Sequence, residues 1–414
     1  MTIFEIINKL SNGGMDGLFS QIYGKSKDEL LRQRARFLNC AENFSRLYPL
    51  REDVRIFSVP ASLILGGEFA PYQHRFCISA AASADILGFV AYHDEQILRI
   101  SSDFFEAIEI DLSDLSDIAE KYKGFAAVAA GIISEFADMG ISCGGFDAYI
   151  SSDIPEISAF DFNSTLNILI CSIINNSVEN KLSEIEIAKI GHKFSENHTG
   201  FLPYLGSAIG GVALFNMKNP HEPQVHKLNF DFFQWGYCLC MVDLGGEGSF
   251  EKIDEDLKSV AESMGAVYLG DIDDEAFFDV ISQICNKCTS RELSHAIWFV
   301  EENNRCRIEA ECLESGRFTD FLEIFNESGN DTAVMLLSGY SPKNEEKFKA
   351  ALAVSMSRKY LGGSGAIRLC NGYLLAFVPN FMAKGYAGTI DEIMGPGCTK
   401  IMGLRKEANG ELYV

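Results

Sequence analysis

GGFDAYISSDIPEISAFDFNSTLNIL, residues 144–169, is the stretch that decides the expected fold. The alternating pattern at Ala148–Ser152 predicts a strand, and Asp153–Pro155 predicts a turn. The apolar run that begins near Asn163 or Ser164 predicts a buried helix. A strand, a loop and a helix N-terminus typically form an anion site, because the first helical turn leaves N–H groups free at the positive end of the dipole.

The loop between this strand and this helix lacks the residues that phosphate binding needs. Glycines normally let the backbone approach the anion, and small hydroxyl side chains line it. Residues 156–163, EISAFDFN, contain no glycine, one serine, two phenylalanines and two acids. The sequence therefore predicts the scaffold of an anion site without its chemistry.

The whole chain has the composition of a folded protein with two domains. It has 414 residues, of which 47% are apolar and 22% charged, and 35 basic against 58 acidic residues give a net charge of −23. Such a field repels nucleic acid and anionic membranes. The start MTIFEIINKL has neither the basic flank nor the long apolar run of a signal peptide, and twelve scattered cysteines fit reduced thiols. We expect a cytoplasmic protein with no nucleic-acid or membrane partner and no metal.

Helices and strands outside this stretch indicate the α+β class. A capping box at Ser26–Glu29 predicts a helix to Leu47, and Ser183 is the expected N-cap of a helix over 182–194. Further helices are expected at 124–139 and 251–264. Strands are expected at 54–59, 214–227 (a pair), 237–243, 366–369 and 373–378. The Pro-rich turn at 219–223 is the best candidate for a domain joint.

Several segments together resemble bacterial galactokinases of the GHMP small-molecule kinase superfamily. They are spread over nearly the whole chain: LRQRARFL (31–38), RIFS (55–58), GGFDAYISSD (144–153), EIAKIG (186–191), SAIGG (207–211) and LAFVPN (375–380). The resemblance implies a ribosomal-protein-like N-terminal domain, here 1–218, and a ferredoxin-like C-terminal domain, here 219–414. In that family ATP and the sugar bind in the cleft between the two domains.

The family's catalytic pair is altered in this chain. Where galactokinases have an arginine beside the catalytic aspartate, this chain has Ser62, and the aspartate itself falls on Pro203, after an apparent deletion. Proline has no side-chain group that takes a proton. The resemblance therefore leaves no intact catalytic residue.

The family's sugar-holding positions are also largely altered. Gly66-Gly67 is retained, but the histidine and the aspartate of the family fall on Phe69 and Pro71, and its tyrosine falls on Phe250. None of these three side chains can make the hydroxyl contacts. Glu68 and Tyr72, in the same motif, keep groups that can hydrogen-bond a ligand.

The family's phosphate motif aligns without a gap but has lost its glycines. Its positions fall on Ile157, Ser158, Ala159, Phe160, Asp161, Phe162 and Asn163. Asp161 stands on a phosphate-facing serine, and two negative charges about 5 Å apart repel by roughly 3 kcal/mol at an effective dielectric of about 20. The magnesium positions fall near Asn163 and on Asn167, and Cys370-Asn371-Gly372 replaces a longer glycine-rich loop. We therefore expect no cofactor unless the chain still phosphorylates a sugar with ATP and Mg²⁺.

Three functions stay open at this stage. The first is a pseudokinase that has lost sugar phosphorylation and acts through a partner protein, such as an active kinase. The second is an active galactokinase, converting ATP and galactose to galactose 1-phosphate, or a related sugar kinase, with Asp153, Asp161, Glu68 or Asp147 as displaced carboxylates. The third is a protein that binds another, unknown small molecule in the cleft. Phe160 and Phe162 have two interpretations, as plugs of the cleft or as core residues.

Overall fold

The computed structural model describes residues 1–157, 159–195, 200–245, 250–336, 345–370, 372–406 and 409–412. For residues 250, 251 and 345–347 it describes the backbone alone. Two positions singled out above, Ser158 and Asn371, lie outside the described residues, and so does the side chain of Phe250.

In chain order, the elements of residues 1–245 are α1 (Ile3–Ser11), α2 (Asp16–Ile22), α3 (Lys27–Leu47), β1 (Arg55–Gly66), α4 (Ala70–Gln73), β2 (Phe76–His93), β3 (Ile97–Ser102), β4 (Ile108–Asp111), α5 (Ile118–Lys121), α6 (Phe125–Asp138), β5 (Gly145–Ser152), α7 (Phe162–Asn176), α8 (Glu184–Lys193), α9 (Phe201–Ile209), β6 (Val212–Asn216), β7 (Gln224–Lys227), η1 (Phe232–Gln234) and β8 (Tyr237–Asp243). The elements that follow are α10 (Phe250–Ser263), η2 (Leu269–Asp271), α11 (Asp274–Ile284), α12 (Ser290–Glu314), α13 (Phe318–Met335), α14 (Glu345–Leu361), β9 (Ala366–Leu369), β10 (Tyr373–Pro379), α15 (Ala383–Met394), β11 (Thr399–Met402) and β12 (Gly410–Leu412).

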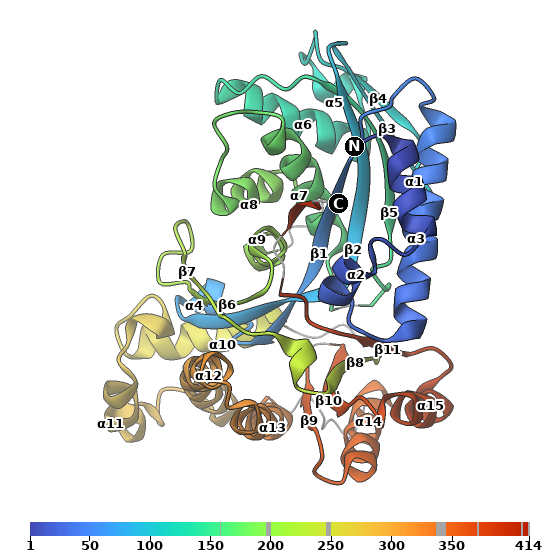
Figure 1. The fold of residues 1–414 in the computed structure, drawn as a ribbon. Coiled ribbons are helices and arrows are strands. Elements are labelled where there is room, and N and C mark those ends of the chain that lie inside the picture. Colours follow the sequence, from blue (N-terminus) through green and yellow to red (C-terminus); the bar gives the residue numbers. More distant parts are fainter. Residues whose placement is uncertain are drawn as a thin grey trace.

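Two sheets organise the described chain (Figure 1). The larger has the order β12-β1-β2-β5-β3-β4, and β6 and β7 extend it from β2. Its pairs are antiparallel except β3 with β5. The smaller sheet has the order β11-β8-β10-β9 and is antiparallel throughout. Mixed helices and largely antiparallel sheets are the α+β class that the sequence predicts.

Helices cover both faces of the larger sheet (Figure 1). Side chains alternate along a strand, so neighbouring residues of β1 face opposite layers. Ile56 packs with the core of α1–α3, whereas Phe57 packs with the core of α6–α9. The buried helix α7 therefore lies against the sheet with its N-terminus at the exit of β5.

The smaller sheet is also covered on both faces. Leu239 and Met241 of β8 face the cluster that includes α12 and α13, and Cys240 and Val242 face α14 and α15. The first of these clusters also holds Leu63 and Leu65 of β1, so it joins the two sheets.

Most predicted elements are confirmed within a few residues. The strand predicted at 148–152 is β5, which begins three residues earlier, and the helix expected near Asn163 is α7, which begins at Phe162. The expected helices at 124–139, 182–194 and 251–264 are α6, α8 and α10. The strand expected at 54–59 runs on to Gly66 as β1.

The capping box predicted at Ser26 is wrong, although Ser26 is the N-cap of α3. The Ser26 side chain accepts no capping hydrogen bond. Glu29 instead accepts hydrogen bonds from Arg32 and Gln33, at 2.9 Å each from Nε and Nε2, so it is not available to bond the backbone of Ser26.

The domain boundary at 218/219 stays a prediction. The turn at 219–223 joins β6 and β7, which pair with each other in the larger sheet. Beyond it, β12 also pairs with β1, so two segments after residue 218 belong to the larger sheet.

Candidate functional site

The start of α7 holds a carboxylate of the chain itself. Asp161 is the N-cap, and its Oδ1 accepts a hydrogen bond of 3.0 Å from the backbone N–H of Ser164. The hydroxyl groups of Ser164 and Thr165 donate to the carbonyl oxygen of Asp161, at 2.8 and 3.2 Å. The Asp161 carboxylate therefore takes up the Ser164 N–H, one of the donors that this helix start would otherwise offer to an anion.

The apolar residues around the loop before α7 pack against the protein core, although only Ile157 among them is buried. Ile157, Ala159 and Phe160 pack with the cluster that joins the two sheets. Phe162 packs with the core of α6–α9, where its ring meets Phe104 edge-on at 5.0 Å. The loop is thus held at both ends by hydrophobic burial. Asn163 is half-buried in the first turn of α7.

Helix α9 occupies the space next to Ser62. The Ser62 hydroxyl donates to the carbonyl oxygen of Pro203 at 3.0 Å. A Cβ built on Gly206 of α9 would lie 2.7 Å from Ser62 Cβ and 2.8 Å from its Oγ. A side chain much larger than serine at position 62 would therefore clash with α9. Pro203 lies in the first turn of that helix, where proline is tolerated.

The motif after β1 is tied to the smaller sheet and to α12. Glu68 accepts a hydrogen bond of 2.7 Å from Arg368 Nη2 of β9. The Arg368 guanidinium also donates to the carbonyl oxygen of Leu65. Phe69 is buried, and its ring meets Trp298 edge-on at 5.9 Å. Glu68 and Phe69 are therefore held by internal partners.

Arg368 lies in a buried cluster of carboxylates on α12. Its Nη2 is 2.9 Å from Glu302 Oε1, and Glu302 Oε2 accepts from Ser328 Oγ at 2.8 Å and from Arg305 Nε at 3.1 Å. Burial would raise the pKa of Glu302, but Arg368 and Arg305 hold it below its usual value. Burial raises the pKa of Glu68, with Arg368 opposing the shift.

These basic and acidic partners were not found from the sequence. The one available signal is that Arg368 stands inside the apolar strand AIRLC, because a charge in a buried strand requires a partner. That signal does not identify Glu68 and Glu302 as the partners.

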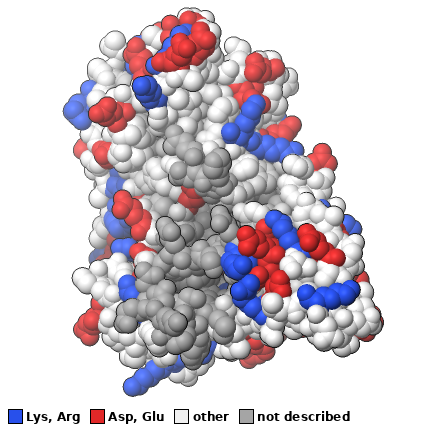
Figure 2. Space-filling view, turned by 180° about the vertical axis from the view of Figure 1, so that it is seen from behind, with Lys and Arg blue, Asp and Glu red and all other residues white. Residues whose placement is uncertain are grey.

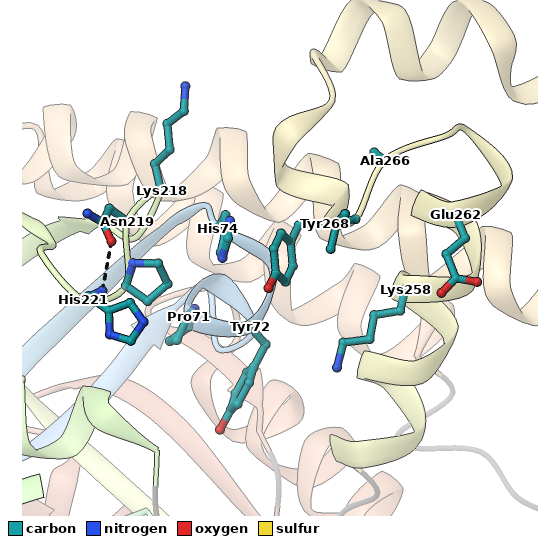
Figure 3. Close-up of a pocket in the computed structure, with 12 residues that line it drawn as sticks. Pro71, Tyr72, His74, Lys218, Asn219, His221, Lys258, Glu262, Ala266 and Tyr268 are labelled. Carbon is teal, nitrogen blue, oxygen red and sulfur yellow. Dashed lines mark hydrogen bonds between the residues drawn. The ribbon is translucent and has the colours of Figure 1, made fainter. Parts of the chain in front are cut away.

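Pro71 and Tyr72 line a surface pocket (Figure 3). Pro71 is in the first turn of α4, and the Tyr72 side chain is 47% exposed. Burial of part of the phenol and the charge of Asp254 raise the pKa of Tyr72. These two positions are separated from Glu68 and Phe69, which face the interior.

Comparison with known proteins supports the family resemblance over most of the chain. It is 22% identical to a galactokinase of Bacillus subtilis over 304 residues, covering 69% of this chain and 76% of that protein. It is 21% identical to a galactokinase of Lactiplantibacillus plantarum over 364 residues, covering 81% and 90%. No family model matches the chain.

Solved structures agree in fold. The crystal structure of Lactococcus lactis galactokinase complexed with galactose superposes with a TM-score of 0.70 at 17% identity, covering 90% of this chain and 98% of that one. Methanococcus jannaschii mevalonate kinase gives 0.58 at 15% identity, covering 85% and 98%. The chain therefore has the fold of the GHMP kinases, and its sequence is similar to galactokinases over most of its length.

In this GHMP kinase fold, the other candidate carboxylates lie in structural ion pairs. Asp153 Oδ2 is 2.9 Å from Arg32 Nη2 and 3.3 Å from Arg36 Nη1. Asp147 Oδ2 is 2.6 Å from Arg51 Nε, and its Oδ1 is 3.1 Å from Arg99 Nη1. Asp147 lies within β5, beside Arg99 of the neighbouring strand β3, and Asp153 lies just after β5, where it pairs with arginines of α3.

The position of the family's magnesium glutamate serves a structural contact. Asn167 is buried, and its Nδ2 donates to the carbonyl oxygens of Gly191 and Phe194, at 3.1 and 3.4 Å. It thereby satisfies carbonyl groups at the C-terminal end of α8. Across the described residues, no group of three or more His, Cys, Asp or Glu side chains is arranged to hold a metal ion.

On the face opposite to the one in Figure 1, the described surface carries both basic and acidic side chains (Figure 2). Figure 2 shows basic and acidic side chains next to one another at the lower right, over the part that carries α10 and α11. Among the helices described, none combines the length and the apolar character needed to cross a bilayer. The expectations about nucleic acid and partners stay predictions.

Proposed function

We propose that this galactokinase-like protein no longer transfers a phosphoryl group from ATP to a sugar. The observation that carries the proposal is Asp161, whose carboxylate caps α7 at 3.0 Å from the Ser164 N–H. A nucleotide phosphate at this helix start would compete with a negative charge that is already hydrogen-bonded there. This residue set does not fit ATP or its magnesium ion.

The absence of a free base supports the same proposal. Phosphoryl transfer depends on positioning and on charge stabilisation, and a missing general base alone lowers the rate by about 10²–10⁴. Pro203 supplies no base, and Glu68 is paired with Arg368 at 2.7 Å. Asp147 and Asp153 are paired with arginines. The kinase alternative would need one of these pairs to open.

The biological role is then one of binding rather than of phosphoryl transfer. We propose that the protein works in the cytoplasm through a partner protein, an active kinase being the first candidate. All twelve cysteines are free thiols, which fits a reducing compartment. Co-purification of the full chain with an active galactokinase of the same cell would support this role, and separate elution of the two would contradict it.

The test of lost activity is transfer of the γ-phosphate of ATP to hexoses. Purified full-length protein with ATP, Mg²⁺ and galactose should give no labelled sugar above the blank without protein, while an active galactokinase in the same assay gives galactose 1-phosphate. Glucose, mannose and fructose should give the same result.

Labelled hexose that disappears in the Asp161→Asn variant would overturn the proposal. In that case Asp161 would act in transfer rather than as a cap, because asparagine keeps the capping geometry and loses only the charge.

A further inference from the structure

A surface pocket of about 710 Å³ beside α4 is not used by the function proposed above. Three segments form it: α4 and the residue after it, the turn at 218–221 between β6 and β7, and α10 with the chain that follows to Tyr268 (Figure 3). Pockets of roughly 300–1,000 Å³ are the size that holds small organic ligands.

Hydrogen bonds through Gln73 fix one wall of this pocket. Gln73 is fully buried; its Oε1 accepts from the Leu269 N–H at 3.0 Å, and its Nε2 donates to Asp254 Oδ1 at 2.7 Å. The other oxygen of Asp254 is 2.6 Å from Lys258 Nζ. A chain of contacts thus connects α4, η2 and α10 and positions the Lys258 ammonium at the pocket.

The aromatic wall is equally well packed. His74 has a left-handed backbone, with φ 61° and ψ 46°, which is uncommon for a residue other than glycine. Its ring lies against Tyr268, with centroids 3.7 Å apart and 34° between the planes, as Figure 3 shows. A Cβ built on Gly270 would lie 1.9 Å from the Gln73 carbonyl oxygen, so η2 packs directly on α4. The pocket is therefore preformed.

The lining favours an anion, although the chain has a net charge of −23. Two lysines, Lys218 and Lys258, stand on opposite sides of the aromatic residues (Figure 3). The hydrogen bond to Asp254 raises the pKa of Lys258, which keeps it charged. Within the described chain, Lys218 has no ion-pair partner. Among the described residues that line the pocket, Glu262 is the one carboxylate.

The same pocket also presents apolar surface to the solvent. Tyr72 is 47% exposed and Val267 is 68% exposed, and both line it. An exposed aromatic ring and an exposed valine can cover a flat or apolar group, whereas the lysines can bind a charged one.

We propose that this pocket binds a small phosphate monoester whose body carries a flat ring. Lys258 binds the phosphate, Lys218 adds attraction from the opposite wall, and Tyr72 with Val267 covers the ring. The inference does not rest on the loss of phosphoryl transfer, because the pocket lies outside the start of α7.

The test uses phenyl phosphate as the probe, by titration calorimetry on the full-length protein. Phenol and inorganic phosphate are the matched controls, because each supplies one half of the probe. We expect phenyl phosphate to bind at least about tenfold more tightly than either, since charge-assisted hydrogen bonds and apolar burial then act together. Equal affinity for all three, or no binding of phenyl phosphate, would overturn the proposal.

Variants of the lining lysines locate the binding. Lys258→Gln should lower the affinity for phenyl phosphate by about tenfold, and Lys218→Gln should lower it by about threefold. Lys252→Gln is the control, because Lys252 is on the same helix, is 3.5 Å from Glu255 and does not line the pocket.

Glu262→Gln should change the affinity for phenyl phosphate in the opposite direction from the lysine variants. Removal of this negative charge should raise the affinity for phenyl phosphate by a few-fold and leave the affinity for phenol unchanged. Unchanged melting temperatures establish that the variants are folded. Unchanged affinity in Lys258→Gln, or weaker binding in Glu262→Gln, would place the ligand elsewhere and overturn the assignment.

Discussion

Glu309 of α12 is a buried carboxylic acid whose oxygens accept no hydrogen bond from the residues that the structure describes. It lies close to Gly66, where a built Cβ would be 3.3 Å from its Oε2 and 3.2 Å from Glu302 Oε1. Burial, with the charge of Glu302 adding to it, raises the pKa of Glu309 well above 4.5. The folded protein therefore keeps the Glu309 proton to a higher pH than the unfolded chain does.

This proton makes the free energy of unfolding depend on pH. The unfolded chain releases it near pH 4.5, whereas the folded protein keeps it, so stability falls as the pH rises from about 4.5 toward the folded pKa. The slope from this group alone is up to about 1.4 kcal/mol per pH unit. Glu309→Gln removes that slope, so the variant should become more stable than the wild type as the pH increases, with little difference at pH 4.

Urea unfolding at a series of pH values from 4 to 9 measures the effect. Glu311→Gln is the matched control, because Glu311 is an exposed glutamate two residues along the same helix. Parallel stability curves for wild type and Glu309→Gln would contradict a retained proton.

Helix starts differ in how far the sequence predicts them. At Ser183 the expected cap is confirmed, and Glu186 completes a capping box. At Ser26 the same sequence pattern forms no capping box, because Arg32 and Gln33, one turn after Glu29, donate hydrogen bonds to the Glu29 carboxylate. At α7, the sequence predicts that the charge of Asp161 opposes phosphate, and the structure adds that its side chain caps the helix. Local patterns predict the helix, but competing side-chain partners decide the cap.

The cap on α7 predicts a stability effect at the element scale. Asp161→Ala removes the acceptor of the Ser164 N–H and should cost about 1 kcal/mol, within the usual range of about 0.5–2. Asp161→Asn keeps a capping oxygen and should cost only a few tenths of that. Chemical denaturation measures the free energy of unfolding of each variant, and amide hydrogen exchange at Ser164 measures the local stability of the helix start.

The same loss in both variants would contradict the capping role. It would show that the negative charge, acting on the helix dipole, matters more than the hydrogen bond.

Periodicity is sufficient for most strands and helices but not for the candidate site. The alternating and helical patterns predict β5, α6, α8 and β8 from neighbours in the chain. The partners of Arg368 cannot be found in this way, because Glu68 is 300 residues away along the sequence. Likewise, only the packing of α9 on β1 explains why Ser62 has no room for a larger side chain.

At the scale of the whole molecule, two buried arginines join the two sheets. Arg368 of β9 reaches Glu68 and the carbonyl oxygen of Leu65 at the end of β1. Arg405 follows β11, its backbone N–H donates to Ala81 of β2 at 2.9 Å, and its Nη1 donates to Ser58 at 2.7 Å. Both contacts lie beside the apolar cluster that the sheets share, so polar and apolar contacts fix the same junction.

Removal of the Arg368 guanidinium should destabilise the whole fold rather than one element. Arg368→Met keeps much of the side-chain volume but leaves Glu68 and Glu302 buried with one cation fewer, and uncompensated buried charges of this kind cost about 3–5 kcal/mol. Arg368→Lys keeps the charge but not the planar fork, so its stability should lie between those of the wild type and Arg368→Met. Adding Glu68→Gln and Glu302→Gln to Arg368→Met should recover part of the loss, because neutral amides need no counter-charge. Urea denaturation of the wild type, the two single variants and the triple variant measures these differences. A loss below about 1 kcal/mol for Arg368→Met would mean that water or another cation reaches the carboxylates. The junction between the sheets would then depend on its apolar contacts alone.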